Sequence, residues 1–263
     1  MLYIVGTGPG SSDYLAPRAK DVLEKVDTIA GYSTYIDLIK DIIGDKKIIS
    51  TTMTKEVQRV EMAIDEALNN KSCALVSGGD SGIYAMAGLV FEICQKRDIK
   101  LVRSNPGNKN TTDQAKNQIT LEIVPGIPAL AAGAALAGAP LTHDFATISL
   151  SDLLTPWDKI EKRLELAALA DFVIVIYNPK SKKRDWQLTR AKKIILQHRD
   201  PDTPACVVTG AMRENQKITI SKLDTIDKED VGMQSILFIG SSASLQYLDY
   251  IFTPRGYGKK YNL

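Results

Sequence analysis

Cysteine, histidine and long apolar runs are all scarce in this sequence of 263 residues. The three cysteines, Cys73, Cys94 and Cys206, form no CxxC pair, which argues against a zinc or iron–sulfur site, so we expect no metal ligands. Apolar neighbours surround Cys73 and Cys206, which favours buried thiols. An odd number of thiols and no secretory leader are typical of a protein of the reducing cytoplasm.

The longest apolar stretch, from Ala129 to Pro140, is far shorter than the roughly 20 residues that a membrane span needs. The charges nearly balance, with 33 basic and 31 acidic residues, whereas a nucleic-acid-binding domain is strongly basic. We therefore expect a soluble protein that binds neither membrane nor nucleic acid.

Short apolar runs alternate with segments of helical periodicity along the chain. Strands are expected at 2–5, 27–32, 47–51, 73–77, 100–103, 118–124, 145–150, 172–177, 205–209, 217–221 and 235–240. Helices are expected at 17–26, 55–70, 85–97, 129–137, 156–168 and 186–197. This alternation predicts an α/β fold with a mostly parallel sheet.

We expect two α/β domains, 1–140 and 141–263, with a ligand cleft between them. The strand at 217–221 alternates polar and apolar residues, which predicts a half-exposed antiparallel strand. The strand at 235–240 is expected to close the second sheet, and the breaker-rich segment 104–112 to form a surface loop.

The first strand leads into Gly6-Thr7-Gly8-Pro9-Gly10, which at first sight suggests a nucleotide-binding turn. A dinucleotide fold needs GxGxxG with a helix that begins at once, but here the helix begins only at Pro17. Pro9 also lacks the backbone N–H that a phosphate cradle would use. A plain strand-to-helix turn is an alternative explanation for these glycines when they are considered alone.

Three further turns of glycine or proline each follow a predicted strand. They are Gly78-Gly79-Asp80-Ser81-Gly82-Ile83-Tyr84, Val124-Pro125-Gly126-Ile127-Pro128-Ala129-Leu130 and Ile176-Tyr177-Asn178-Pro179. Open parallel sheets bind ligands beyond the carboxyl ends of their strands. Glycine is needed there wherever a Cβ would block the approach of backbone to ligand.

In order and spacing, these four turns resemble the tetrapyrrole (corrin/porphyrin) methyltransferase family, whose fold is not the Rossmann fold. The segments SLSDLLTPW (149–157) and YNPKSKKRDWQL (177–188) are similar to the branch that methylates C17 of precorrin-3B or its cobalt form and contracts the ring in cobalamin synthesis. Thr253 to Tyr257 agrees with that branch. A family member acting at another ring carbon is the alternative.

The resemblance implies S-adenosylmethionine as cofactor and a homodimer. The residues carried over as cofactor contacts are Pro9, Gly78, Gly79, Asp80, Ile83, Pro128, Ala129, Asn178 and Ala211. Asp80 is expected to steer the cofactor, to cap the helix that follows it, or to do both. Two departures from the family pattern are Ser81, where proline is frequent, and the run Thr209 to Met212 around Ala211.

A tetrapyrrole carries several carboxylates, which call for cationic partners. Arginine binds carboxylates with two parallel hydrogen bonds, so Arg184 is the first candidate, followed by Lys182 and Arg18. The lysines near Arg184 fit a solvated basic face equally well. The resemblance leaves open whether the substrate carries cobalt, and we favour the cobalt form.

Ring contraction, which the resemblance also implies, requires proton transfers, for which histidine is suited near neutral pH. His143 lies beside Asp144 at the expected domain junction. The pair is either catalytic, including contact with a central cobalt, or a structural hinge.

Overall fold

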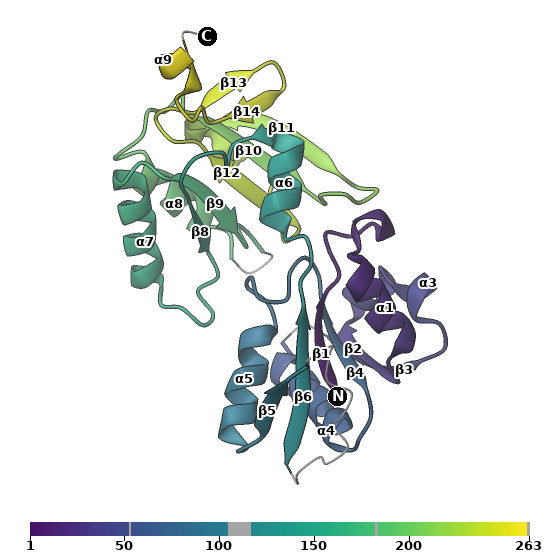
Figure 1. The fold of residues 1–263 in the computed structure, drawn as a ribbon. Coiled ribbons are helices and arrows are strands. Elements are labelled where there is room, and N and C mark those ends of the chain that lie inside the picture. The colour runs from purple at the N-terminus through teal and green to yellow at the C-terminus, as the bar shows by residue number, and fades with distance from the viewer. Residues whose placement is uncertain (53, 105–116, 182–183, 262–263) are drawn as a thin grey trace. The chain divides into compact units, whose positions relative to one another are not determined.

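The computed structural model describes residues 1–52, 54–104, 117–181 and 184–261. The chain forms two compact units, Met1–Ala129 and Leu130–Leu263 (Figure 1). The sequence placed the boundary between residues 140 and 141, after the Ala/Gly-rich helix. The structure assigns almost all of that helix to the second unit, because it packs on a strand of that unit. Most of the expected surface loop at 104–112 lies outside the described residues.

Six parallel strands form the sheet of the first unit, in the order β3-β2-β4-β1-β6-β5. They are β1 (Leu2–Gly6), β2 (Thr28–Tyr32), β3 (Lys47–Thr51), β4 (Cys73–Ser77), β5 (Lys100–Arg103) and β6 (Gln118–Val124). The predicted parallel sheet is thus confirmed. Because all strands run in one direction, their carboxyl ends lie at one edge, which we call the carboxyl edge of the first sheet.

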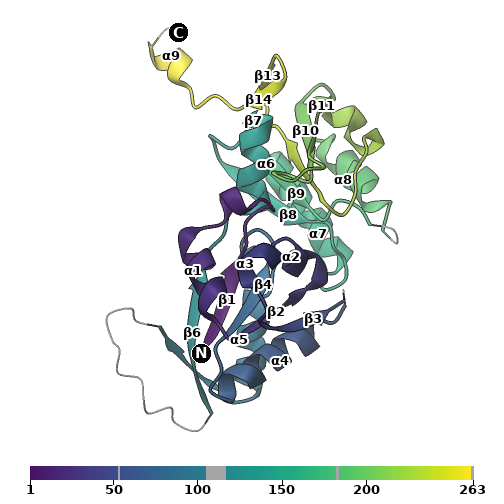
Figure 2. The ribbon, with the colours of Figure 1, turned by 90° about the vertical axis from the view of Figure 1, so that its right-hand side faces the viewer.

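Helices cover both faces of this sheet (Figures 1 and 2). The helices α1 (Pro17–Lys25), α2 (Ser33–Asp37) and α3 (Lys40–Ile43) share a core with one face, and α4 (Glu56–Leu68) and α5 (Ala87–Lys96) with the other. Side chains alternate along β1, so that Leu2 and Ile4 join the core of α4 and α5, while Val5 joins that of α1. A short 3-10 turn, η1 (Ser12–Tyr14), precedes α1, whose first residue is a proline, as helix starts allow.

The second unit contains a mixed sheet with the order β11-β10-β12-β9-β8. Its strands are β8 (Phe145–Ser149), β9 (Val173–Tyr177), β10 (Pro204–Thr209), β11 (Lys217–Lys222) and β12 (Ser235–Ile239). The predicted antiparallel strand at 217–221 is confirmed. The prediction that 235–240 closes the sheet is wrong, since β12 lies in its middle, antiparallel to both β9 and β10. Hence β8, β9 and β10 run in the same direction and end at one edge, the carboxyl edge of the second sheet.

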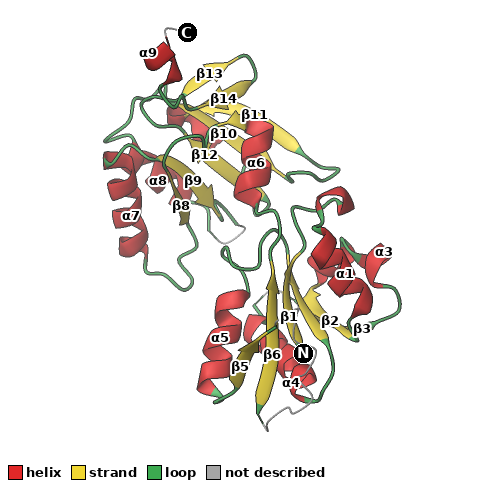
Figure 3. Cartoon of the chain, viewed as in Figure 1, coloured by secondary structure: helices red, strands yellow, loops and turns green. Residues whose placement is uncertain are grey.

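The helices α7 (Trp157–Leu169) and α8 (Gln187–Ile195) cover one face of this sheet with η2 (Leu223–Lys228), and α6 (Ala129–Ala137) lies on the other (Figure 3). A Cβ on Gly133 of α6 would lie 2.9 Å from the ring of Phe238, a fully buried residue of β12. This close contact explains why α6 belongs to the second unit. The unit also holds β7 (Gly138–Ala139), β13 (Leu245–Tyr247), β14 (Tyr250–Phe252) and α9 (Tyr257–Tyr261).

The three cysteines are buried and free of disulfides, which confirms the burial predicted for Cys73 and Cys206. Burial raises the pKa of the Cys73 and Cys206 thiols to about 12, so neither forms a thiolate near neutral pH. Within the described ranges, no group of three or more His, Cys, Asp or Glu residues is arranged to hold a metal ion. None of the helices that the structure describes has the length and apolar character needed to cross a membrane.

Candidate functional site

The turns that follow β1 and β4 are joined by backbone hydrogen bonds at the carboxyl edge of the first sheet. Gly8 N donates to Gly79 O over 3.0 Å, and Gly79 N donates to Gly8 O over 2.7 Å. Thr7 donates to Ser77 O through both its backbone N and its Oγ1. The φ angles of Gly8 and Gly79 are 74° and 68°, in the left-handed region that glycine favours. The two turns therefore form one unit.

Gly126, in the turn after β6, completes this arrangement. A Cβ built on Gly126 would lie 2.2 Å from Gly79 O, and one built on Gly6 would lie 2.7 Å from the same oxygen. Both contacts are with backbone, which cannot rotate aside as a side chain does. The three turns after β1, β4 and β6 thus meet at a point where only glycine fits. We call these turns the glycine junction.

Asp80 ties two of these turns together through its carboxylate. Its Oδ1 accepts a hydrogen bond from Gly82 N over 2.8 Å, and its Oδ2 accepts one from Gly126 N over 3.1 Å. The alternative that Asp80 caps the following helix is wrong, because α5 begins only at Ala87, and Met86 is its N-cap. Asp80 therefore acts as a positioning residue of the glycine junction.

The other cofactor contacts expected in the first unit lie at or beside this junction; they are Pro9, Gly78, Ile83, Pro128 and Ala129. Pro9 is buried within the first turn, and Ile83 is half-buried in the segment between β4 and α5. Gly78 is packed so closely on Tyr35 that a Cβ would lie 2.6 Å from the ring. The structure therefore brings this predicted set together, although Ile83 lies farther along the chain than the turns themselves.

Asn178 lies at the carboxyl edge of the second sheet, directly after β9. Its φ is +49°, a conformation that asparagine tolerates better than most residues. Its side-chain Nδ2 donates to Ser149 Oγ, at the end of β8, over 3.0 Å. Next to it, Tyr177 Oη accepts a hydrogen bond from Leu130 N, in the first turn of α6. These contacts fix the turn at the carboxyl edge.

Ala211 lies at this same edge, in the turn that follows β10. Its neighbours Gly210 and Met212 both have positive φ, so the chain reverses tightly around it. Gly210 N donates to Gln234 O over 3.1 Å, and Met212 N to Gln216 Oε1 over 2.9 Å. The structure thus places Ala211 and Asn178 on the same side of one sheet, as the resemblance implied.

His143 and Asp144 lie at the opposite edge of the second sheet. They precede β8, whereas Asn178 follows β9, and the two strands are parallel. The length of β8, at about 3.3 Å per residue, separates the two edges. His143 is exposed, and its Nδ1 accepts a hydrogen bond from Asp144 N over 2.8 Å. The expectation of a catalytic pair is at odds with this placement, because ligand groups gather at the carboxyl ends of strands.

We therefore predict that His143→Gln leaves catalysis unchanged. The variant is expected to keep kcat/KM within about twofold of wild type, since a general acid or base typically contributes about a hundredfold or more. Steady-state kinetics of the methyl transfer that the resemblance implies measures this directly. A loss of about a hundredfold with unchanged thermal stability would restore His143 to the catalytic machinery.

Ion pairs and hydrogen bonds link side chains at this edge, where the parallel strands β8 and β9 begin. Asp171 is in an ion pair with the buried Arg199, at 2.6 Å, and accepts hydrogen bonds from the N and Oγ of Ser242. Burial alone would raise the pKa of Asp171, but the Ser242 hydrogen bonds and the Arg199 charge outweigh it. The pKa of this carboxyl therefore lies below its usual value of 3.8.

Because folding lowers this pKa, the ionised Asp171 stabilises the folded protein above the unfolded-state pKa, and the stabilisation is lost as the pH falls through the folded-state pKa. The difference in unfolding free energy between wild type and Asp171→Asn is expected to stay constant from about pH 7 to about pH 5 and to shrink as the pH falls further, through 3.8 and below. Urea denaturation across this range measures it. A difference that stays constant would contradict the ionic role of Asp171.

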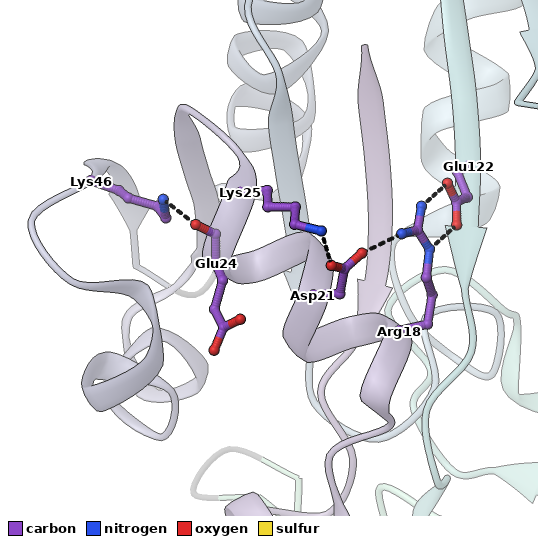
Figure 4. A network of polar contacts seen from close by, with 6 residues as sticks. All are labelled: Arg18, Asp21, Glu24, Lys25, Lys46 and Glu122. Atoms are coloured by element: carbon purple, nitrogen blue, oxygen red, sulfur yellow. Dashed lines mark hydrogen bonds and ion pairs between the residues drawn. The ribbon is translucent and has the colours of Figure 1, made fainter. Parts of the chain in front are cut away.

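Arg18, a predicted substrate-binding residue, is engaged within the protein instead (Figure 4). Its Nε and Nη2 donate to the two carboxylate oxygens of Glu122 over 2.7 and 2.6 Å, and its Nη1 donates to Asp21. The hydrogen bonds to Glu122 raise the pKa of this guanidinium. With two carboxylates already bound, Arg18 is a strut between α1 and β6, so its expected role in binding substrate is not supported.

Arg184, by contrast, lies at the carboxyl edge of the second sheet. Its Nη1 donates to Asn178 O, and its backbone pairs with that of Ser181. Burial lowers the pKa of its guanidinium, an effect that the charge of Asp152 partly offsets. Lys182, the other cation predicted in this segment, lies outside the described residues.

The model of the tetrapyrrole (corrin/porphyrin) methylase family matches residues 1–107 and 111–227 of this chain. The matched ranges include the glycine junction and the turns that carry Asn178 and Ala211. The chain belongs to this family. The resemblance inferred from the sequence is thus confirmed.

Individual methylases of this family give a finer comparison. The cobalt-factor III methyltransferase of Priestia megaterium is 42% identical over 262 residues, which are 100% of this chain and 46% of that protein. The probable cobalt-factor III C(17)-methyltransferase of Salmonella typhimurium is 39% identical over 98% of this chain and 99% of its own. The chain therefore spans about half of the first relative and nearly all of the second. The crystal structure of the methyltransferase CobJ superposes with a TM-score of 0.83, at 30% identity over 96% of this chain and 99% of that one.

Two residues at the carboxyl edge of this methylase's second sheet escaped the sequence prediction. Ser149 and Tyr177 are the last residues of β8 and β9, and both hold neighbouring backbone or side chains in place. Their position at the ends of predicted strands could have marked them as residues of the site. Their partners, Asn178 and Leu130, are 29 and 47 residues away and could not be inferred from local pattern.

Proposed function

We propose that this chain is an S-adenosylmethionine-dependent methyltransferase that methylates C17 of a cobalt-loaded tetrapyrrole and contracts its ring during cobalamin synthesis. The names of the Priestia megaterium and Salmonella typhimurium relatives both support cobalt-factor III as the substrate, and the name of the second also supports C17 as the methylated carbon. The observation that carries the proposal in this molecule is the glycine junction, at the edge where α/β sheets bind ligands.

The residues of the first unit suit S-adenosylmethionine. The glycine junction presents bare backbone, which a flat adenine or an extended methionine chain can approach closely. Two hydroxyl oxygens beside it, Ser77 Oγ and Ser81 Oγ, are buried and have no hydrogen-bond partner among the described residues. Buried polar groups without partners are uncommon, and a polar ligand would satisfy them. When bound, the cofactor supplies an activated methyl group on a sulfonium.

The protein residues are proposed to hold and align the reactants, because the methyl group is already activated. Asp80, which accepts hydrogen bonds from Gly82 N and Gly126 N, is proposed to hold the turns after β4 and β6 together where they contact the cofactor. In the second unit, Asn178 and Ala211 are proposed to contact the cofactor from turns that Ser149 and Gln216 hold in place.

Arg184 is the proposed cationic contact for a substrate carboxylate in the second unit, with Lys182 as a further candidate. The Arg184 guanidinium already orders the Asn178 turn. A substrate carboxylate is proposed to accept hydrogen bonds from other N–H groups of this guanidinium, and such charge-assisted hydrogen bonds are among the stronger ones in proteins.

Calorimetric titration tests the cofactor assignment. We expect S-adenosylhomocysteine to bind wild-type protein with one site per chain and NAD to give no heat. Binding of NAD without S-adenosylhomocysteine would refute the assignment. Parallel titrations with cobalt-loaded and metal-free tetrapyrrole distinguish the favoured substrate from its metal-free counterpart.

We also propose that the chain acts as a homodimer in the cytoplasm. A groove of the second unit supports self-association: its lining combines apolar side chains of Leu136, Ile218 and Tyr250 with the polar side chains of Thr219, Gln246 and Asp249. Strand β11 is also an edge strand, whose outer backbone groups are available to a second copy. The free thiols suit a reducing compartment. Sedimentation equilibrium is expected to give twice the chain mass.

A further inference from the structure

Arg59 is a buried cation at the carboxyl edge of the first sheet. It lies in the first turn of α4, and its side chain is only 3% exposed. Its Nε donates to Thr51 Oγ1 over 2.9 Å, and its Nη2 donates to Thr52 O over 3.3 Å. Because Thr51 is the last residue of β3, these bonds place the guanidinium at the edge that holds the glycine junction.

Both acceptors of Arg59 are neutral, which is unusual for a buried arginine. The other buried arginine, Arg199, is paired with Asp171 at 2.6 Å, and Arg18, Arg97 and Arg190 also have carboxylate partners. Among the described residues, no carboxylate oxygen is within 4.0 Å of the Arg59 guanidinium. Burial lowers the pKa of Arg59, and the more distant charge of Glu56 only partly offsets this. A buried guanidinium stays protonated, so this charge lacks a counterion.

Two tyrosines lie between the strand whose end Arg59 contacts and the glycine junction, since Tyr32 of β2 is in register with Thr51 of β3 and β2 lies between β3 and β4. Tyr32 ends β2, and its ring meets that of Tyr35 edge to face, with centroids 5.6 Å apart. Tyr35 in turn packs on Gly78, which follows β4. Strands are about 4.8 Å apart, so β3 lies roughly 10 Å from β4 and roughly 14 Å from β1. A carboxylate at Arg59 would therefore belong to a ligand group well away from the junction.

We propose that Arg59 binds a peripheral carboxylate of the tetrapyrrole, with Tyr32 and Tyr35 forming the wall between that carboxylate and the methyl-transfer site. This inference rests on the proposed function and adds a substrate contact to it. The carboxylate of the cofactor's methionine has the same chemistry. The macrocycle is favoured because its carboxylates lie on the rim of a large ring, at the distance that the strand order requires.

The test compares Arg59→Gln with wild type and with the control Arg97→Gln, which removes an arginine already paired with Asp65. Arg59→Gln is expected to bind S-adenosylhomocysteine within about twofold of wild type, but the tetrapyrrole roughly ten- to hundredfold more weakly, as the loss of a hydrogen bond to a charged group implies. Arg97→Gln is expected to bind both as wild type does. Weakened binding of S-adenosylhomocysteine alone would assign Arg59 to the cofactor and overturn the proposal.

A methyl-esterified tetrapyrrole makes the test specific for charge. The affinity ratio of wild type to Arg59→Gln is expected to fall to about one with the ester, because the partner charge is gone. An affinity ratio that is the same for the acid and the ester would show that Arg59 only supports the fold, and it would overturn the proposal. If Arg59→Gln does not fold, Arg59→Lys decides by the same comparison, since it keeps the charge and loses the two-pronged geometry. Failure of the proposed function can be told apart from failure of the Arg59 proposal, because the wild-type protein itself would then bind no tetrapyrrole.

Discussion

Gly126→Ala is expected to abolish methyl transfer and to weaken S-adenosylhomocysteine binding by about a hundredfold or more, as a misplacement of about 1 Å can do. The added Cβ would lie 2.2 Å from Gly79 O and 2.7 Å from the backbone of Gly6. Since both neighbours are backbone, the turns themselves must separate. Overpacking of this kind typically costs about 1–3 kcal/mol of stability. Calorimetry and thermal unfolding measure the two effects.

Gly88→Ala is the matched control for this substitution. Gly88 lies within α5, and a Cβ there would meet nothing within 4 Å. Alanine is favoured over glycine in a helix by up to about 1 kcal/mol, so this variant should be as stable as wild type or more so, with full activity. If Gly126→Ala behaves like Gly88→Ala, the glycine junction is not part of the cofactor site.

Asp80→Ala is expected to have the second largest effect. It leaves Gly82 N and Gly126 N without their acceptor, and each hydrogen bond to a charged group is worth roughly 1.5–3 kcal/mol. Both stability and S-adenosylhomocysteine affinity should fall together, because the carboxylate holds the turns in place. Asp80→Asn keeps one acceptor oxygen and should fall between alanine and wild type.

The comparison of kcat with affinity distinguishes positioning from direct catalysis by Asp80. A positioning residue changes cofactor affinity and stability, and its asparagine variant recovers part of both. An Asp80→Asn variant with normal affinity and stability but a much lower kcat would instead indicate proton transfer by the carboxylate. Asp45→Ala, at an exposed position before β3, is the control and should resemble wild type.

The parallel sheet of the first unit was predictable because strands and helices alternate along the sequence and leave few other topologies. The strand order in the second unit could not be predicted, because β12 lies between β9 and β10. It pairs there with residues of β10 about 30 positions away and with residues of β9 about 60 positions away. The short helices α2 and α3, of 5 and 4 residues, are too brief for periodicity to reveal.

The candidate site, too, was predictable from the sequence only in part. Glycine marks turns in the sequence, so Gly78, Gly79 and the turn holding Gly126 could be found, but their mutual contact depends on the register of three strands. Arg18 was predicted to contact substrate, and its ion pair with Glu122 could not be inferred from local pattern because the two residues are 104 positions apart. The place of His143 could have been read from the sequence, because it precedes a predicted strand, whereas Asn178 and Ala211 each follow one.

Transfer of an isotopically labelled methyl group from S-adenosylmethionine to cobalt-factor III tests the central claim most directly. The wild-type protein is expected to place one labelled methyl on C17 of the macrocycle, located by carbon NMR of the product, and Gly126→Ala to place none. Label on a different ring carbon, or no label on the macrocycle despite binding of both reactants, would contradict the proposed function.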